Sequence, residues 1–203
     1  MSESLTRAGE NLKKRGFTVT VFQTAAEACE YLCKTVRGTT VGFGGSVTLQ
    51  EMGLYEKLAE NNRVFWHWSR PEGVPPGAVI AQADTAEVYI TSANALAETG
   101  EIVNIDAGCN RVASSVHGHK KVIFVIGENK LAENCEKAVY RARNVAAPLN
   151  AKRLHADTPC AVNGDRCYDC SAPGRICRNL SILMGKPLPG EFEVILIGEK
   201  LGY

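Results

Sequence analysis

The sequence predicts an α/β fold, a mostly parallel β-sheet with helices on its faces. Strand and helix patterns alternate along the chain, which is the order that βαβ units produce. Residues 121–126 (KVIFVI) form a continuous apolar run, as expected of a strand buried on both faces. With 203 residues and 45% hydrophobic content, the chain can bury one sizeable core. We expect a single domain over residues 1–203, with a cysteine-rich metal-binding segment at 155–182.

The N-terminal part contains a helix, a strand and a second helix. Residues 3–15 read as a charged opening helix, and residues 17–22 (FTVTVF) alternate like a strand. Thr24 and Glu27 have the spacing of a capping box, in which each side chain accepts a hydrogen bond from the other residue's backbone N–H. A helix should therefore begin there.

A glycine turn follows the next strand. Residues 39–43 make a short apolar strand, then come Gly44, Gly45 and Ser46, and residues 48–51 form a second capping box that should start a helix. Glycines allow close approach of the backbone to a ligand, and a helix N-terminus favours an anion. A tight turn without a ligand explains the same residues equally well.

Three further strands are expected before residue 107. They cover residues 63–68, 86–91 and 101–106. His67 could serve as a base or a ligand, although a histidine in an aromatic strand is more often simply packed. The stretch between the second and third of these strands, residues 92–100, is short and polar, so we expect a loop at the site.

The C-terminal part contains one long helix, the cysteine segment and a last strand. A helix is expected from residue 132 to 146 and should be stopped by Pro148. A short helix is expected near residues 175–182, and residues 192–197 (FEVILI) supply the final strand.

Polar side chains follow several of the predicted strands, and such loops meet at one edge of a parallel sheet. Arg111 and Lys130 could hold a carboxylate or phosphate, and Glu98 and Asp106 could act as acid or base. Each residue alone is more often a cap or a solvated loop residue, so their shared location favours a site. We predict catalytic roles for Glu98, Asp106 and Lys130. The predicted ligand-binding residues are Gly44, Gly45, Ser46, Thr48, Asn94, Asn110, Arg111 and Asn129.

Half of the eight cysteines lie in one turn-rich segment, with the spacing C-x6-C-x2-C-x6-C. The pair separated by two residues has the spacing that lets two thiolates reach one metal or cluster edge. Thiolate ligands suit structural zinc or an iron–sulfur cluster, while disulfides and inert buried thiols are the alternatives. We predict metal ligands at Cys160, Cys167, Cys170 and Cys177.

Charge and hydropathy exclude several classes of protein. The 23 basic and 22 acidic side chains leave a net charge of +1, which gives no case for nucleic acid as a partner. No apolar run approaches the roughly 18 residues of a membrane span, and the polar N-terminus does not resemble a signal peptide. We expect a cytoplasmic protein, where thiols stay reduced.

Four segments together resemble the LUD domain family, the lactate-utilisation proteins. They are GFGGSVTLQEMGL (42–54), TSANALAETGEIVNIDAGCNRVASSVHGHKKVIFVIGENK (91–130), RNVAAPLNAKRL (143–154), and TPC through CYDC to GRIC (158–177). The resemblance runs from residue 5 to residue 200. It implies a fold like that of ribose-5-phosphate isomerase, glucosamine-6-phosphate deaminase and the coenzyme A transferases. It also implies a link to oxidation of L-lactate to pyruvate beside iron–sulfur subunits.

Three functional hypotheses follow. The first is a LUD protein that carries an iron–sulfur cluster of the 4Fe-4S type on the four cysteines and takes part in oxidation of L-lactate or a related small hydroxy acid. The second is a non-redox enzyme of the sugar-phosphate or acyl-coenzyme A type, or a small-molecule-binding regulator, with a structural zinc. A third and weaker hypothesis is a subunit that serves only assembly and carries out no chemistry in a pocket. The expected partners are a small anionic substrate and iron–sulfur lactate-oxidation subunits. The sequence leaves the oligomeric state open, and a homo-oligomer is one of the alternatives.

Overall fold

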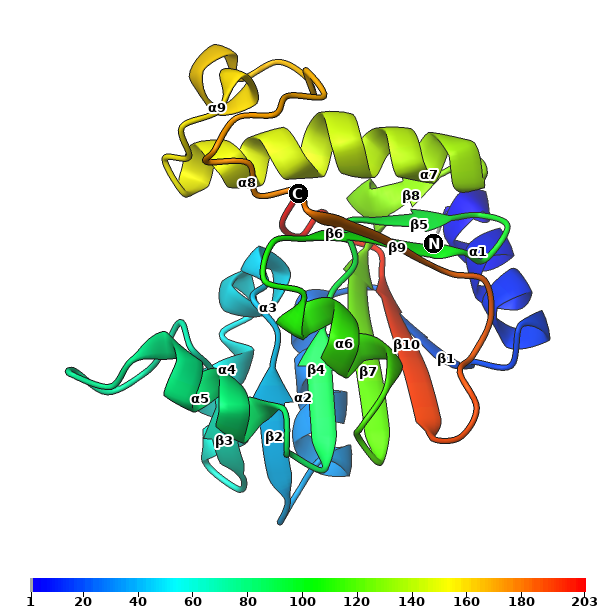
Figure 1. Cartoon of the computed structure of the whole chain (residues 1–203). Coiled ribbons are helices and arrows are strands. Elements are labelled where there is room, and N and C mark those ends of the chain that lie inside the picture. Colours follow the sequence, from blue (N-terminus) through cyan, green and yellow to red (C-terminus); the bar gives the residue numbers. More distant parts are fainter. Residues whose placement is uncertain (1) are drawn as a thin grey trace.

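A fully parallel six-stranded sheet forms the centre of the protein. The structure is a computed structural model, and it describes residues 2–203. The strand order is β1-β10-β7-β4-β2-β3, and every neighbouring pair is parallel (Figure 1). The strands are β1 (Thr18–Phe22), β2 (Thr40–Phe43), β3 (Arg63–Phe65), β4 (Val88–Thr91), β7 (Lys121–Gly127) and β10 (Glu191–Ile197). The α/β class and the parallel sheet predicted from the sequence are confirmed.

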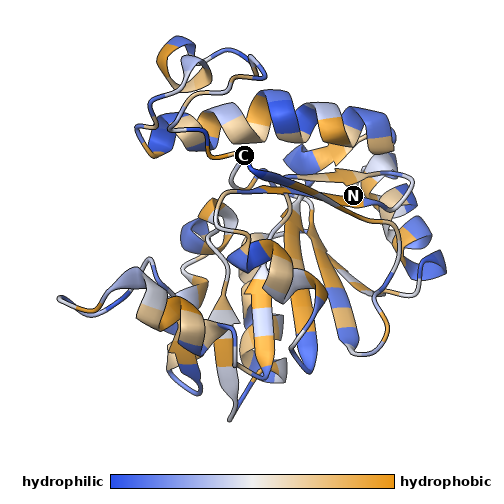
Figure 2. Ribbon diagram, in the orientation of Figure 1, coloured by the Kyte–Doolittle hydropathy of each residue, from blue (hydrophilic) through white to orange (hydrophobic). Residues whose placement is uncertain are grey.

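The central strands are apolar on both faces, as the run at residues 121–126 predicts. In β7, Ile123 and Val125 join the core on one face, while Val122, Phe124 and Ile126 join the core on the other. Burying both faces is what makes a parallel strand read as a continuous apolar run. In Figure 2 these strands are coloured mainly as hydrophobic residues.

Helices cover the two faces of this sheet. One face carries α2 (Ala25–Thr35), α3 (Val47–Glu51) and α4 (Leu54–Ala59), and the other carries α1 (Glu3–Lys14). Two further helices, α5 (Pro76–Ala83) and α6 (Asn110–Val116), lie against β2–β3 and β4–β7. The capping box at Thr24 and Glu27 forms as predicted and starts α2.

A smaller second sheet, which the sequence does not predict, lies above the first. Its order is β8-β5-β6-β9, from β5 (Ala95–Ala97), β6 (Ile102–Asp106), β8 (Leu131–Ala132) and β9 (Asn179–Leu183). The polar stretch at residues 92–100 therefore contains a buried strand rather than only a loop. Three residues are too few to show the alternating pattern of a strand, but Ala95, Leu96 and Ala97 are all fully buried.

A long helix lies across this second sheet (Figure 1). It consists of α7 (Cys135–Arg141), a π-helical turn (Ala142–Ala146) and α8 (Ala147–Arg153). Pro148 does not stop it, contrary to the sequence prediction. Proline lacks a backbone N–H and crowds the carbonyl four residues earlier, and the wider π turn just before it accommodates both effects.

Two other local predictions are also wrong. The second capping box does not form, because Ser46 caps α3 through Leu49 N, and Thr48 turns inward instead. The helix expected near residues 175–182 is replaced by β9, which pairs antiparallel with β6. A short helix, α9 (Pro159–Asn163), opens the cysteine segment.

Candidate functional site

A cleft of about 350 Å³ opens where three adjacent central strands end. β2, β4 and β7 are neighbours in the sheet, and their carboxyl ends run into Gly44, Ser92 and the 3₁₀ turn at Glu128–Lys130. In open parallel sheets this edge is the usual ligand site. The lining residues that matter below are Ser46, Ser92, Asn94, Asp106, Asn110, Arg111, Lys130, Arg153 and Tyr203.

Lys130 is a buried amine on the floor of this cleft. Its side chain is only 3% exposed, and its Nζ donates to Thr48 Oγ1 at 2.7 Å and Ser92 Oγ at 2.9 Å. Within residues 2–203 it forms no ion pair with a carboxylate. Burial, followed by the charges of Arg141 and Arg111, lowers the pKa of Lys130 from 10.5 to about 7.

Arg111 reaches the cleft from the first turn of α6. Its guanidinium donates to Asn104 Oδ1 at 3.0 Å, to Asn94 Oδ1 at 3.2 Å and to the Ile105 carbonyl. These bonds use three of the five guanidinium N–H groups and fix the plane of the group. Its Nε lies 3.9 Å from Asp106 Oδ2, too far for a strong hydrogen bond. Arg111 therefore keeps N–H groups for a ligand.

Asp106 lines the cleft, but backbone N–H groups already use its carboxylate. Oδ1 accepts from Ala107 N at 2.8 Å, and Oδ2 accepts from Val112 N at 3.0 Å. These bonds anchor the start of α6 to the end of β6. The predicted acid or base role of Asp106 remains a prediction, and its observed contacts are those of a helix anchor.

The remaining predicted residues divide between the cleft and its supports. Gly45, Ser46, Asn94 and Asn110 line it. Gly44 is not among the lining residues; a Cβ there would be 2.7 Å from Thr91 Oγ1, so this glycine permits close side-chain approach, and its ligand-binding role remains a prediction. Thr48 supports Lys130 from behind.

Two predicted residues are not brought into the cleft. Asn129 binds the backbone of the C-terminal residues, accepting from Leu201 N and donating to Gly202 O, both at 3.0 Å. Glu98 lies apart, with its carboxylate 3.3 Å from Arg7 Nε on α1. The structure therefore does not group Glu98 with Lys130 and Arg111.

Several lining residues were missed by the sequence reasoning. Ser92 follows β4 directly, so its place after a strand could have revealed it. Arg153 and Tyr203 could not be found this way, because they come from α8 and from the last residues of the sequence. The Arg153 guanidinium lies 4.5 Å from the centre of the Trp68 ring and donates to Tyr203 OH at 2.8 Å. Burial raises the pKa of Tyr203.

His67 also lines the cleft. Burial, followed by the nearby charge of Arg70, lowers its pKa, which keeps the ring neutral at pH 7.

The four cysteines of the C-terminal segment border one small cavity of about 20 Å³. All eight cysteines of the chain, these four included, are free thiols, so the structure contains no disulfide between them. Backbone and hydroxyl groups lie close to two of the sulfurs: Asp169 N donates to Cys167 Sγ at 3.3 Å, and Thr158 Oγ1 lies 3.4 Å from Cys160 Sγ.

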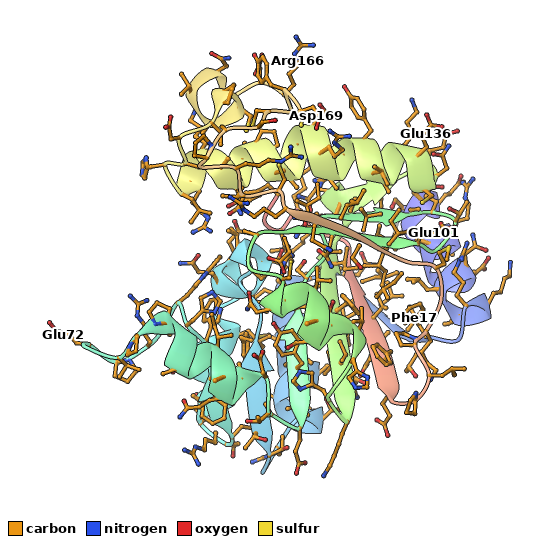
Figure 3. The ribbon with its side chains drawn as sticks, viewed as in Figure 1. Phe17, Glu72, Glu101, Glu136, Arg166 and Asp169 are labelled. Atoms are coloured by element: carbon orange, nitrogen blue, oxygen red, sulfur yellow. The ribbon has the colours of Figure 1, made fainter. Side chains whose placement is uncertain are left out.

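The π turn of the long helix holds this segment. Asn144 Oδ1 accepts from Cys167 N at 3.2 Å, and Arg143 donates to Asp169 Oδ1 at 2.9 Å. Figure 3 shows Arg166 and Asp169 above the long helix, far from Glu72 at the tip of another loop. π turns are often found at functional sites because they shift side chains out of the regular helical register.

Four thiols around a common cavity fit a thiolate-bound metal by donor type. In the described chain, residues 2–203, no three His, Cys, Asp or Glu side chains are arranged as ligands of one ion. Ala147 and Ile176 line both this cavity and the cleft. A metal here would therefore be separated from the cleft by a single layer of side chains.

No helix in residues 2–203 has the length and apolar character needed to cross a membrane.

Comparison with known proteins identifies relatives of this fold. The model of the LUD domain matches residues 5–197. Among solved structures, a DUF162 family protein from Deinococcus radiodurans aligns with a TM-score of 0.56 and 16% identity, covering 98% of this chain and 99% of that chain. At that identity the likeness shows a shared fold. No curated protein matches the chain.

Proposed function

The chain belongs to the LUD domain family, associated with lactate utilisation, and from this we propose that it binds a small 2-hydroxy or 2-oxo carboxylate in the cleft and takes part in its oxidation or reduction. The four cysteines hold an iron–sulfur cluster in this proposal. The observation that carries it is the charge of the cleft: Arg111, Arg153 and the partly protonated Lys130 line it, against Asp106 as the acidic lining residue. Such an excess of positive charge favours an anion.

The size of the cleft supports a small ligand. Its volume of about 350 Å³ is at the lower end of the range for small-molecule sites. One N–H on Nε and one on Nη1 of Arg111 remain unused, and such an N–H can donate a charge-assisted hydrogen bond to a carboxylate oxygen. The neighbouring hydroxyl groups of Ser46 and Ser92 can orient the rest of the molecule.

Lys130 is the residue best suited to move a proton. Oxidation of a 2-hydroxy acid to a 2-oxo acid breaks the O–H bond and the C–H bond at the same carbon, and it releases two protons and two electrons, which a one-electron carrier would have to accept in two successive steps. A pKa of about 7 lets the Lys130 amine accept that proton at neutral pH. An iron–sulfur cluster on Cys160, Cys167, Cys170 and Cys177 would relay single electrons towards iron–sulfur subunits of a lactate-oxidation complex.

Metal analysis and ligand screening together test this proposal. Protein purified without oxygen should contain iron and acid-labile sulfide and absorb in the visible region. L-Lactate and pyruvate should each raise the melting temperature, because a ligand that binds only the folded state stabilises it. One zinc per chain without iron would refute the redox role. Absence of any shift with both acids would refute the carboxylate site.

A second candidate has one observation in its favour, the size of the cysteine cavity. About 20 Å³ accommodates a single atom or ion, whereas a cluster of four irons requires the cysteine side chains to move outward. A structural zinc fits the observed space. The cleft would then serve a non-redox enzyme or a regulator that binds a sugar phosphate or acyl-coenzyme A. Stabilisation by these compounds, and not by lactate or pyruvate, would select this function.

A further inference from the structure

The Lys130 side chain combines three features that a surface lysine lacks. It is 3% exposed, it has hydroxyl groups rather than carboxylates as partners, and it faces a cavity. A buried cation without a negative partner is costly, so a structural explanation alone would favour an apolar residue at this position. The buried carboxylate of Glu193 shows the usual solution, since its Oε2 lies 2.7 Å from Lys121 Nζ.

Two of the three charged groups near Lys130 lower its pKa. Arg141 from α7 and Arg111 from α6 repel its proton, and Glu51 from α3 opposes them. Arg141 is held through its own donors, with Nε bound to Asn129 O at 3.0 Å and Nη1 bound to Asn94 O. Burial, together with these fixed positive charges, keeps a large fraction of the Lys130 amine unprotonated at neutral pH, and the unprotonated amine is the nucleophilic form.

A guanidinium with unused N–H groups lines the same cleft as this amine. Arg111 can hold a carboxylate, and in a 2-oxo acid the carbon bonded to the carboxylate is an electrophilic carbonyl. We propose that Lys130 forms a Schiff base with the carbonyl carbon of a small 2-oxo acid whose carboxylate is bound by Arg111. This inference rests on the carboxylate site proposed above and adds a covalent step to it.

The step is balanced with groups that are present. The Lys130 nitrogen forms a bond to the carbonyl carbon, and the carbonyl oxygen leaves as water together with the two amine protons, giving an imine. Ser92 and Thr48 can pass these protons, because their hydroxyls lie 2.9 and 2.7 Å from the nitrogen. An imine withdraws electrons from the neighbouring carbon, so the site would activate that carbon for proton loss or bond cleavage.

Reductive trapping tests the inference. The full-length protein is incubated with pyruvate and sodium cyanoborohydride, which reduces the imine to a stable secondary amine. Intact-mass and peptide analysis should show one reduced pyruvate adduct per chain, located on Lys130. At pH 7 this lysine should be labelled at least about a hundredfold faster than an ordinary surface lysine, because far more of it is unprotonated.

Two variants and one parallel measurement complete the design. Lys130→Met should abolish the adduct, and Lys120→Met, which changes an exposed lysine, should not. The melting temperature with pyruvate is measured without the reductant. Stabilisation by pyruvate without an adduct on Lys130 would overturn the Schiff base and leave the carboxylate site standing. No stabilisation and no adduct would overturn both. An adduct spread over surface lysines, and equal in the Lys130→Met variant, would also overturn the Schiff base.

Discussion

Replacing Lys130 with methionine should make the protein more stable at low pH and remove part of its dependence on pH. The folded-state pKa of about 7 lies below the unfolded value of 10.5, and each pKa unit corresponds to about 1.36 kcal/mol. Burial of the ammonium form therefore costs about 5 kcal/mol below pH 7. Methionine avoids this cost and retains a similar shape, although the hydrogen bonds to Thr48 and Ser92 are lost.

The sign of the pH effect follows from proton binding. Between pH 7 and pH 10.5 the unfolded chain holds the Lys130 proton and the folded chain has released it. The unfolding free energy of the wild type therefore rises with pH in this window, by up to about 1.4 kcal/mol per pH unit from this group. The difference in unfolding free energy between Lys130→Met and the wild type should therefore fall by about 3 kcal/mol between pH 7.5 and 9.5.

Urea denaturation at four or five pH values provides the assay. The quantity of interest is the difference in unfolding free energy between the variant and the wild type, because the other titrating groups cancel in it. Lys120→Met is the matched control, because Lys120 is exposed and its Nζ lies 3.0 Å from Glu87 Oε1. The unfolding free energy of this variant should stay within about 0.5 kcal/mol of the wild-type value at every pH. A difference for Lys130→Met that is equally flat from pH 7.5 to 9.5 would refute the buried amine with a lowered pKa.

Three other predictions test the cleft, the cysteine segment and the fold. Arg111→Gln should weaken binding of L-lactate or pyruvate by about 2 kcal/mol, roughly thirtyfold in Kd by calorimetry, and an unchanged Kd would contradict the carboxylate role. Cys167→Ser should lower the metal bound per chain by roughly tenfold or more in elemental analysis, whereas Cys135→Ser should leave it unchanged. Gly42→Ala should reduce the unfolding free energy by about 3 kcal/mol, because its Cβ would lie 2.4 Å from the Ala83 carbonyl oxygen. Gly77→Ala, in α5 with open space around it, should instead stabilise by about 0.5 kcal/mol, and equal effects of the two would contradict the packing described.

The main sheet could be predicted from local patterns. Residues 17–22, 39–43 and 121–126 each contain a strand close to the expected bounds, and the capping box at Thr24 starts α2 as expected. These signals are local, since an apolar period or a side-chain cap depends on residues within one element. The second capping box failed because Thr48 has a stronger partner, the buried amine of Lys130 from a distant part of the sequence.

The candidate site was predictable only in part. Ser46, Asn94 and Lys130 follow strands, and parallel topology brings such positions to one edge. The topology does not say which side chains turn inward. Asn129, the neighbour of Lys130, follows the same strand and yet binds the C-terminal backbone. Arg153 enters the cleft because the helix continues through Pro148, which local rules about proline did not anticipate.

The sequence by itself therefore determined the α/β class, the parallel central strands, the family and the grouping of four cysteines, because each depends on neighbouring residues or on a motif. Only the tertiary structure decided the second sheet, the continuous helix over it and the cavity shared by the four thiols. It alone made Lys130 a buried amine with a lowered pKa. The physical reason is that burial and charge repulsion lower this pKa, and both depend on residues far apart in the chain, Arg111 and Arg141 among them.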